Sequence, residues 1–366
     1  MKAIELFAGA GGAALGLEAA GVHHLALCEW DRDACATLRA AGLGPVVEGD
    51  VRDLDAIAAV AGESCDLLWS SFPCQAFSIA GKRLGAQDER NGWPWTVDAI
   101  DRFQPRWFLA ENVRGLLCHR GDCDRRGPPE DCPGCYFERV ILVELRERFE
   151  VVGWWLLDAA DYGVPQHRRR VIIHAGPEPV TPPRATHGPG MFTRPWVSMG
   201  EALNLGQDFQ FSERQNGTRG HTPIAPGRPS PTVQAGSHRD NGLRVIARPS
   251  PSVSCGEWRG SSDSYRKPGK RPKMNMASDA LWDAVGRRRL TVAECATLQG
   301  FPDDHPWHAC RTKTARYRAV GNAVPPRLAQ VVAESVMAAD RIARTGDREK
   351  PLQHGIFDKI VENVHE

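Results

Sequence analysis

The chain has 366 residues and a formal net charge of +1, with 42% hydrophobic and 25% charged residues. This composition is ordinary for a globular protein and excludes a wholly disordered chain. No apolar run approaches the roughly 20 residues that a membrane-spanning helix needs, so we expect no contact with a membrane.

The amino terminus and the cysteines bear on the cellular compartment. The first five residues, Met-Lys-Ala-Ile-Glu, contain no apolar region of the kind found in a signal peptide. We therefore expect a cytoplasmic protein whose eleven cysteines are reduced thiols. We further expect it to be a monomer.

The first half of the chain alternates short apolar strands with helical periods. Strands are predicted over 3–7, 24–28, 46–47, 65–72, 107–110, 154–157 and 171–174, and helices over 13–20, 34–41, 96–103 and 140–148. Such alternation with short connections favours an α/β fold, with a parallel, doubly wound sheet. We assign residues 1–175 to this domain.

The amino-acid composition changes after about residue 176, where Pro, Gly, Ser and Arg dominate. This composition predicts a second, smaller domain over 176–303, irregular or rich in β-strands. Helical periods return over 291–299 and 326–338. Residues 304–340 are therefore predicted to return to the first domain, and residues 341–366 to form a polar tail.

A glycine-rich turn, residues 7–12 (Phe-Ala-Gly-Ala-Gly-Gly), joins the first strand to the first helix. Such a turn lets the backbone approach a nucleotide-type cofactor. The next strand ends in Glu29 and Trp30, placed to bond ribose hydroxyls and to stack on a purine. The third ends in Asp50, a further polar anchor. The turn lacks the three-glycine spacing of a pyrophosphate site, which argues against a nicotinamide-dependent oxidoreductase.

Reactive side chains follow the later strands. Cys74 comes directly after Pro73, Glu111 ends the next strand, and Arg168 and Arg170 precede the last one. The carboxyl ends of strands in open α/β sheets are where such proteins place their chemistry. Because charged groups are rarely buried without partners, packing alone does not explain this set.

These residues resemble the ordered motifs of the bacterial DNA cytosine-5 methyltransferases. The matching segments are 7–12, 73–75, 111–113, 166–170, 289–291 with Glu294, 298–302 and 317–326. Their order and spacing resemble the family over about 3–338. The resemblance implies an S-adenosylmethionine-dependent, Rossmann-like catalytic domain and a smaller target-recognition domain, with double-stranded DNA between them.

The resemblance also implies roles for individual residues. Cys74 would attack C6 of a flipped-out cytosine, Glu111 would protonate N3 if burial raises its pKa, and Arg170, with Arg168, would hold O2. Gln75, Ser78 and Gln166 would belong to the DNA-contacting loops. The implied cofactor site comprises Phe7, Gly9, Ala10, Gly12, Glu29, Trp30, Asp50, Val51, Asn322 and Ala323.

Alternatives within the resemblance concern substrate and biological role. A related enzyme could methylate tRNA, although the long second domain argues against this, and an inactive DNA-binding module would not need Cys74, Glu111 and Arg170. The enzyme could protect DNA from a cognate restriction endonuclease encoded nearby, act alone, or be phage-borne. The target sequence cannot be read from the chain.

A cysteine-rich insertion over about 117–136 lies outside these motifs. Cys118, Cys123, Cys132 and Cys135 fall in a segment with no apolar period that would bury them. Two of them form a Cys-x-x-Cys pair, which is typical of structural zinc sites. We hypothesise that the four bind one zinc ion, with His119 as a substitute for one of them. The alternative is a loop with incidental thiols.

Overall fold

A computed structural model of the protein describes residues 1–73, 91–119, 123–129, 132–204, 209–214, 221–224, 227–233, 244–247 and 287–346. Three of the predicted site residues, Cys74, Gln75 and Ser78, lie outside the described residues. Within the part of the chain that the structure describes, no helix is both long and apolar enough to cross a membrane.

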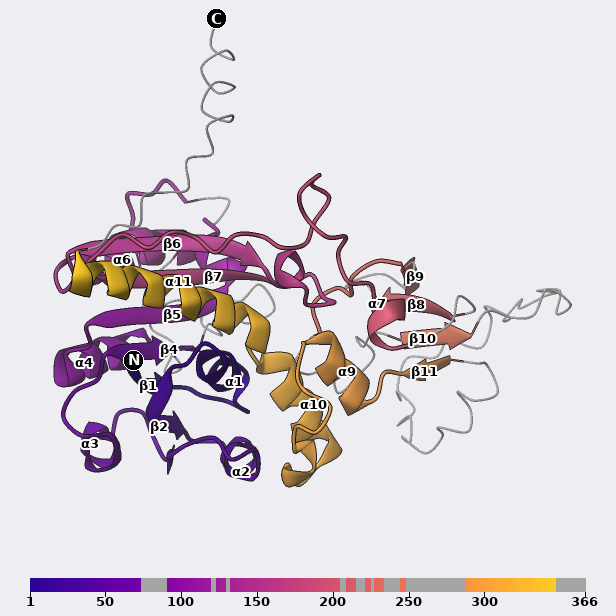
Figure 1. The fold of residues 1–366 in the computed structure, drawn as a ribbon, viewed down its shortest axis with the longest axis horizontal. Coiled ribbons are helices and arrows are strands. Elements are labelled where there is room, and N and C mark those ends of the chain that lie inside the picture. Colours follow the sequence, from indigo (N-terminus) through magenta and orange to yellow (C-terminus); the bar gives the residue numbers. More distant parts are fainter. Residues whose placement is uncertain are drawn as a thin grey trace, which may run out of the picture.

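A seven-stranded sheet forms the centre of the molecule (Figure 1). Its strands are β1 (Lys2–Leu6), β2 (His23–Glu29), β3 (Val46–Glu48), β4 (Leu67–Ser70), β5 (Trp107–Val113), β6 (Val151–Asp158) and β7 (Arg169–Gly176), in the order β3-β2-β1-β4-β5-β7-β6. This confirms the predicted α/β class.

The prediction that all strands run parallel was wrong for β7. This strand pairs antiparallel with both β5 and β6. The connection from β6 to β7 holds only the short helix η5 (Ala159–Tyr162), which is too short for the crossover that parallel strands require. As a result, the start of β7 lies at the same edge of the sheet as the end of β5.

Helices cover both faces of the sheet, as a doubly wound fold requires. The helices of the described residues are α1 (Gly12–Ala19), α2 (Arg32–Ala40), α3 (Leu54–Ala61), α4 (Trp93–Phe103), η2 (Arg114–Leu117), α5 (Pro133–Tyr136), the π-helical η4 (Phe137–Ile141), α6 (Leu142–Arg146), α7 (Met199–Ala202), α9 (Val292–Leu298), η6 (Trp307–Ala309), α10 (Lys313–Asn322) and α11 (Pro326–Thr345). Of these, α7, α9, η6 and α10 pack in a separate cluster and not on the sheet. Helix α3 was not predicted. Helix α11 ends at Thr345, beyond the predicted start of the polar tail.

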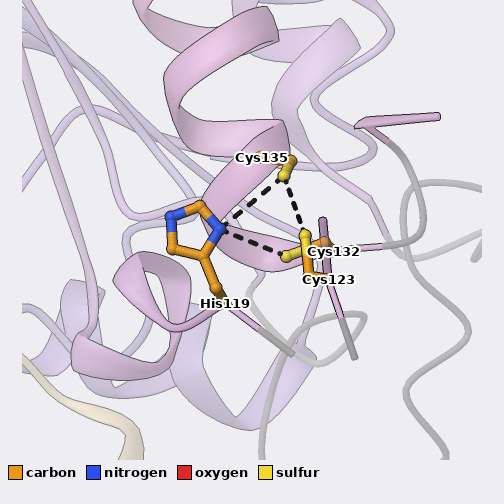
Figure 2. Close-up of side chains that lie close together, drawn as sticks. All are labelled: His119, Cys123, Cys132 and Cys135. Carbon is orange, nitrogen blue, oxygen red and sulfur yellow. Dashed lines mark hydrogen bonds between the residues drawn. The ribbon is translucent and has the colours of Figure 1, made fainter. Parts of the chain in front are cut away.

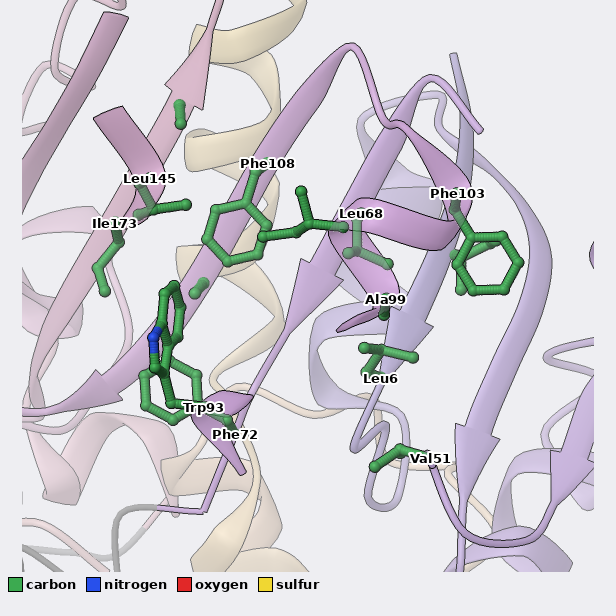
Figure 3. Close-up of a cluster of buried hydrophobic side chains, with 14 of the residues drawn as sticks. Leu6, Val51, Leu68, Phe72, Trp93, Ala99, Phe103, Phe108, Leu145 and Ile173 are labelled. Atoms are coloured by element: carbon green, nitrogen blue, oxygen red, sulfur yellow. The ribbon is translucent and has the colours of Figure 1, made fainter. Parts of the chain in front are cut away.

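The apolar alternation of the strands supplies a separate core on each face. On one face, Leu6, Phe108 and Ile173 pack with α4 and α6 side chains such as Ala99 and Leu145 (Figure 3). On the other face, a second buried cluster joins β1, β4 and β5 to α1 and α11; its members include Ala3, Leu17, Trp69, Trp107 and Val332.

A smaller antiparallel sheet lies beyond the carboxyl end of the central one (Figure 1). It consists of β8 (Phe209–Arg214), β9 (His221–Ile224), β10 (Arg244–Ala247) and β11 (Arg287–Arg289), in the order β11-β10-β8-β9. These strands fall within the 176–303 stretch predicted for the second domain. Helix α9 follows β11 and joins an apolar cluster with Ala10 and Val320, which ties it to the first domain.

Candidate functional site

The glycine-rich turn after β1 is open on one side and packed on the other. Gly9 has a φ of +56°, and a Cβ built there would meet no heavy atom of the described residues within 4 Å. At Gly12 a Cβ would lie only 2.1 Å from the carbonyl oxygen of Val324. The close approach of the C-terminal segment therefore requires glycine at position 12, while the space beside Gly9 is available to a ligand.

Glu29, at the end of β2, hydrogen-bonds to the backbone of this turn. Its Oε2 accepts a hydrogen bond from the Gly9 N–H at 2.7 Å, and its Oε1 accepts from the N–H groups of Trp30 and Asp31 at 3.0 and 2.8 Å. Burial raises the pKa of Glu29, and these three donors oppose that rise. Next to this carboxylate, Trp30 is 76% exposed, so its ring is available for stacking.

The end of β3 adds the predicted residues Asp50 and Val51. Asp50 forms an ion pair with Arg52 at 2.5 Å, and this pair lowers the pKa of the carboxyl group. The Arg52 guanidinium in turn lies 5.1 Å from the ring centre of Trp95. Val51 is buried in the core of the sheet, so it fixes the position of this strand end.

Asn322 and Ala323 end helix α10 beside the same turn. Asn322 is exposed, whereas Ala323 is buried. The Ala323 carbonyl oxygen accepts a hydrogen bond from Nη2 of Arg168 at 2.9 Å, as the Gly321 carbonyl oxygen does at 2.8 Å. The C-terminal segment is thus tied to the residue that precedes β7.

Arg168 and Gln166 are buried, and their side chains bond the protein backbone. Arg168 is 2% exposed, and its Nη1 also donates to the carbonyl oxygen of Val233. Gln166 is fully buried, and its side-chain amide bonds the Leu298 carbonyl and the Val233 N–H. Both ends of this amide are therefore bonded within the protein. The motif pattern gave no information on which way these side chains point.

Glu111 and Arg170 meet at the carboxyl edge of the sheet. Nε of Arg170 lies 2.5 Å from Oε1 of Glu111, and each side chain is about one-tenth exposed. Antiparallel pairing sets Arg170 opposite Val113, which brings the start of β7 to the end of β5. Both groups remain slightly exposed at this edge of the sheet.

The residues on either side of the 74–90 segment are held in place beside the Glu111–Arg170 pair. Nδ2 of Asn112 donates to the Phe72 carbonyl oxygen at 3.2 Å. On the other side of the gap, a Cβ on Gly92 would lie 2.6 Å from Cδ of Pro73. Pro73 and Gly92 therefore pack together, and the residue that precedes Cys74 is held beside the last residues of β5, next to Glu111.

One residue of this arrangement was missed by the sequence analysis. The imidazole Nε2 of His305 bonds the Ala10 carbonyl oxygen at 3.1 Å, and its ring contacts those of Phe301 and Trp307. Burial lowers the pKa of His305 to about 4, so the ring is neutral at pH 7. The position carried no sequence signal because its role depends on a contact between distant segments.

The strand order, the turn after β1 and the antiparallel β7 together define a Rossmann-like α/β fold. The solved structure of the S. pombe Dnmt2 methyltransferase has the same fold. It aligns with a TM-score of 0.59 over 94% of this chain and 99% of that chain, at 16% sequence identity.

The family follows from the sequence comparisons. The model for the C-5 cytosine-specific DNA methylases matches residues 1–338, and this chain belongs to that family. The Type II methyltransferase M.NaeI of Lentzea aerocolonigenes is 32% identical over 93% of this chain and 75% of its own length. The Type II methyltransferase M.NgoMIV of Neisseria gonorrhoeae is also 32% identical, over 92% of this chain and 97% of its own.

Proposed function

We propose that this protein methylates carbon 5 of a cytosine flipped out of a specific duplex DNA sequence, with S-adenosylmethionine as the methyl donor. The observation that carries the proposal is the Glu111–Arg170 pair at the carboxyl edge, beside the anchored residue Pro73. The names of the Type II relatives support a role in restriction–modification. We further infer that a cognate endonuclease recognises the same sequence and that the protein acts in the cytoplasm.

The open side of the glycine-rich turn fits the cofactor. The space beside Gly9 leaves room for the part of the cofactor that lies against the protein backbone. The exposed Trp30 ring provides a face on which the adenine can stack. Glu29 already accepts three backbone hydrogen bonds, and its carboxylate keeps lone pairs for the ribose hydroxyls. When bound here, S-adenosylmethionine supplies an electrophilic methyl group on a sulfonium.

The residues at the carboxyl edge of the sheet activate carbon 5 of cytosine, which is a poor nucleophile by itself. Carbon 5 is too weakly nucleophilic to accept a methyl group, so the Cys74 thiolate adds to C6 while Glu111 delivers a proton to N3. The resulting enamine is electron-rich at C5 and takes the methyl group. Arg170 stabilises the charge that develops near O2. Transfer of the methyl group leaves the donor sulfur as a neutral thioether. Loss of the C5 proton to a base, departure of the thiolate and return of the N3 proton to Glu111 then restore the aromatic ring.

A direct assay separates this function from its alternatives. Radiolabelled methyl groups should enter duplex DNA and not tRNA, and sequencing of the methylated DNA at base resolution should locate them on C5 of cytosine within one short sequence. Label confined to tRNA would replace the DNA substrate with RNA. Absence of transfer to either, by protein that binds DNA tightly, would favour the inactive binding module.

The nucleophile is tested by Cys74→Ser. A serine hydroxyl is a far weaker nucleophile than a thiolate at neutral pH. We expect methyl transfer to fall by at least about 100-fold, with binding of S-adenosylmethionine retained by calorimetry. Cys118→Ser is the matched control, since Cys118 is exposed. Residual activity above about a tenth in Cys74→Ser would contradict covalent attack by this thiol.

A further inference from the structure

Four metal-binding side chains gather where the cysteine-rich insertion meets helix α5. The ligand atoms of His119, Cys123, Cys132 and Cys135 all lie within 4.8 Å of one another. Cys132 and Cys135 are 3% and 2% exposed. Figure 2 shows the Nδ1 atom of His119 facing the sulfurs of Cys132 and Cys135, each at 3.6 Å.

The separations suit a tetrahedral ion better than a disulfide. Zinc bonds of about 2.0 Å to nitrogen and 2.3 Å to sulfur imply about 3.5 Å between nitrogen and sulfur ligands and about 3.8 Å between sulfurs. The separations from His119 Nδ1 to the Cys132 and Cys135 sulfurs, each 3.6 Å, match this value. The Cys123 and Cys135 sulfurs, at 3.3 Å, need to part by about half an ångström. That separation is also well beyond the roughly 2.05 Å of a disulfide.

The second nitrogen of His119 supports the same reading. Nε2 lies 3.3 Å from Oε1 of Glu138, on the opposite side of the ring from the sulfurs. A carboxylate that accepts the Nε2–H fixes the tautomer in which Nδ1 carries the lone pair, as is usual for zinc-bound histidines. Gly134 permits this ring position, because a Cβ there would lie 2.8 Å from the imidazole.

We propose that His119, Cys123, Cys132 and Cys135 bind one structural zinc ion. The sequence-based set held Cys118 as a fourth ligand, with His119 as a substitute for one of the four cysteines; in the structure His119 takes the place of Cys118. Cys118 is exposed, and its thiol lies 3.7 Å from the Arg114 carbonyl oxygen. Three sulfurs and one imidazole form a Cys₃His set, which is typical of structural zinc.

The ion would stabilise the chain segments next to the proposed catalytic edge. The Gly134 N–H bonds the Cys118 carbonyl at 3.1 Å, so the site joins the start of α5 to the chain that follows β5 and η2. Directly after Cys135, the Tyr136 hydroxyl accepts a hydrogen bond from Nδ2 of Asn91 at 2.8 Å. Asn91 begins the described chain after the Cys74 segment. Zinc therefore stabilises the point at which that segment rejoins the fold.

Metal analysis of the full-length protein, purified without chelator, tests the proposal. We expect about one zinc per chain in the wild type and in Cys118→Ser, and less than about a tenth of that in Cys132→Ser and Cys135→Ser. Wild-type protein that is folded and stays metal-free after incubation with zinc would overturn the site. Full zinc content in either ligand variant would overturn the ligand assignment.

Two further measurements keep the test valid if the ligand variants fail to fold. Cobalt(II) bound in place of zinc to the wild type should give the intense ligand-field and thiolate charge-transfer absorption of a tetrahedral thiolate site; a weak octahedral spectrum would contradict it. Glu138→Gln keeps all four ligands and should weaken zinc affinity by about 10–100-fold. The exposed Glu147→Gln is its control, and equal affinity in both variants would remove Glu138 from the site.

Discussion

Glu111 and Glu5 are both buried carboxylates of the seven-stranded sheet, and each faces a basic side chain from a neighbouring strand. Glu111 meets Arg170 at 2.5 Å, and Glu5 meets His24 at 3.3 Å. They differ in where they lie. Glu111 is at the carboxyl edge and keeps some exposure, whereas Glu5 lies inside the sheet with no exposure, beneath the helix α1 residue Glu18, which also contacts His24.

The contrast teaches that burial and charge pairing do not by themselves mark a site. Burial raises the pKa of Glu5, and the nearby His24 only partly offsets this. The pair is thus perturbed, yet neither side chain has any exposure to solvent. Glu111 owes its proposed role to its place at the strand end, where Asn112 also anchors Phe72.

The largest expected difference between the two carboxylates is in catalysis. Glu111→Gln keeps an acceptor for Arg170 but cannot deliver a proton to N3, so the single-turnover methylation rate should fall by roughly 10²–10⁴-fold. Glu5→Gln should leave that rate nearly unchanged and reduce the free energy of unfolding by about 1–3 kcal/mol. A normal rate in Glu111→Gln would contradict the catalytic role of Glu111. Loss of the rate in well-folded Glu5→Gln would contradict the purely structural role of Glu5.

The buried Glu5–His24 pair should instead affect how the stability of the protein depends on pH. Burial alone would lower the pKa of His24, but Glu18 and Glu5 outweigh it and raise the pKa to about 9 from the unfolded value of 6.5. Between these values the folded state binds more protons, so the free energy of unfolding should decrease as pH rises, by roughly 1–3 kcal/mol in all.

Urea denaturation of the wild type and of His24→Gln from pH 6 to 9.5 measures this decrease. The stabilisation from His24 should be complete below about pH 6.5 and lost above about pH 9. The variant should show a flatter profile. Identical slopes in both proteins would mean that His24 does not hold the proton.

The smallest expected effect concerns Trp30, at the edge where Glu29 lies. Loss of one stacking ring costs about 1–3 kcal/mol, so Trp30→Ala should weaken S-adenosylmethionine binding about tenfold by calorimetry. The melting temperature should hardly change, because the ring is 76% exposed. Phe192→Ala is a control of similar exposure, at 75%. Equal affinity in the two variants would remove Trp30 from the cofactor site.

Particular residues show how far sequence reasoning reached. Strand ends could be predicted because apolar runs stop at polar residues, as β2 does at Glu29 and β5 near Glu111. The direction of β7 could not, since it depends on pairing with β5. Arg168 and Gln166 share a motif with Arg170, yet of the three only Arg170 reaches Glu111. Arg168 and Gln166 precede β7, and their side chains bond the backbone of the C-terminal part of the chain instead.

The sequence by itself determined the α/β class, the family motifs and the presence of a thiol-rich insertion, because these depend on local periodicity and residue type. Tertiary structure alone decided that His119, and not Cys118, joins Cys123, Cys132 and Cys135. It also brought Glu111 to Arg170 and His305 to Ala10. These contacts join segments distant in the chain, and only the packing of helices and strands sets the distances between them.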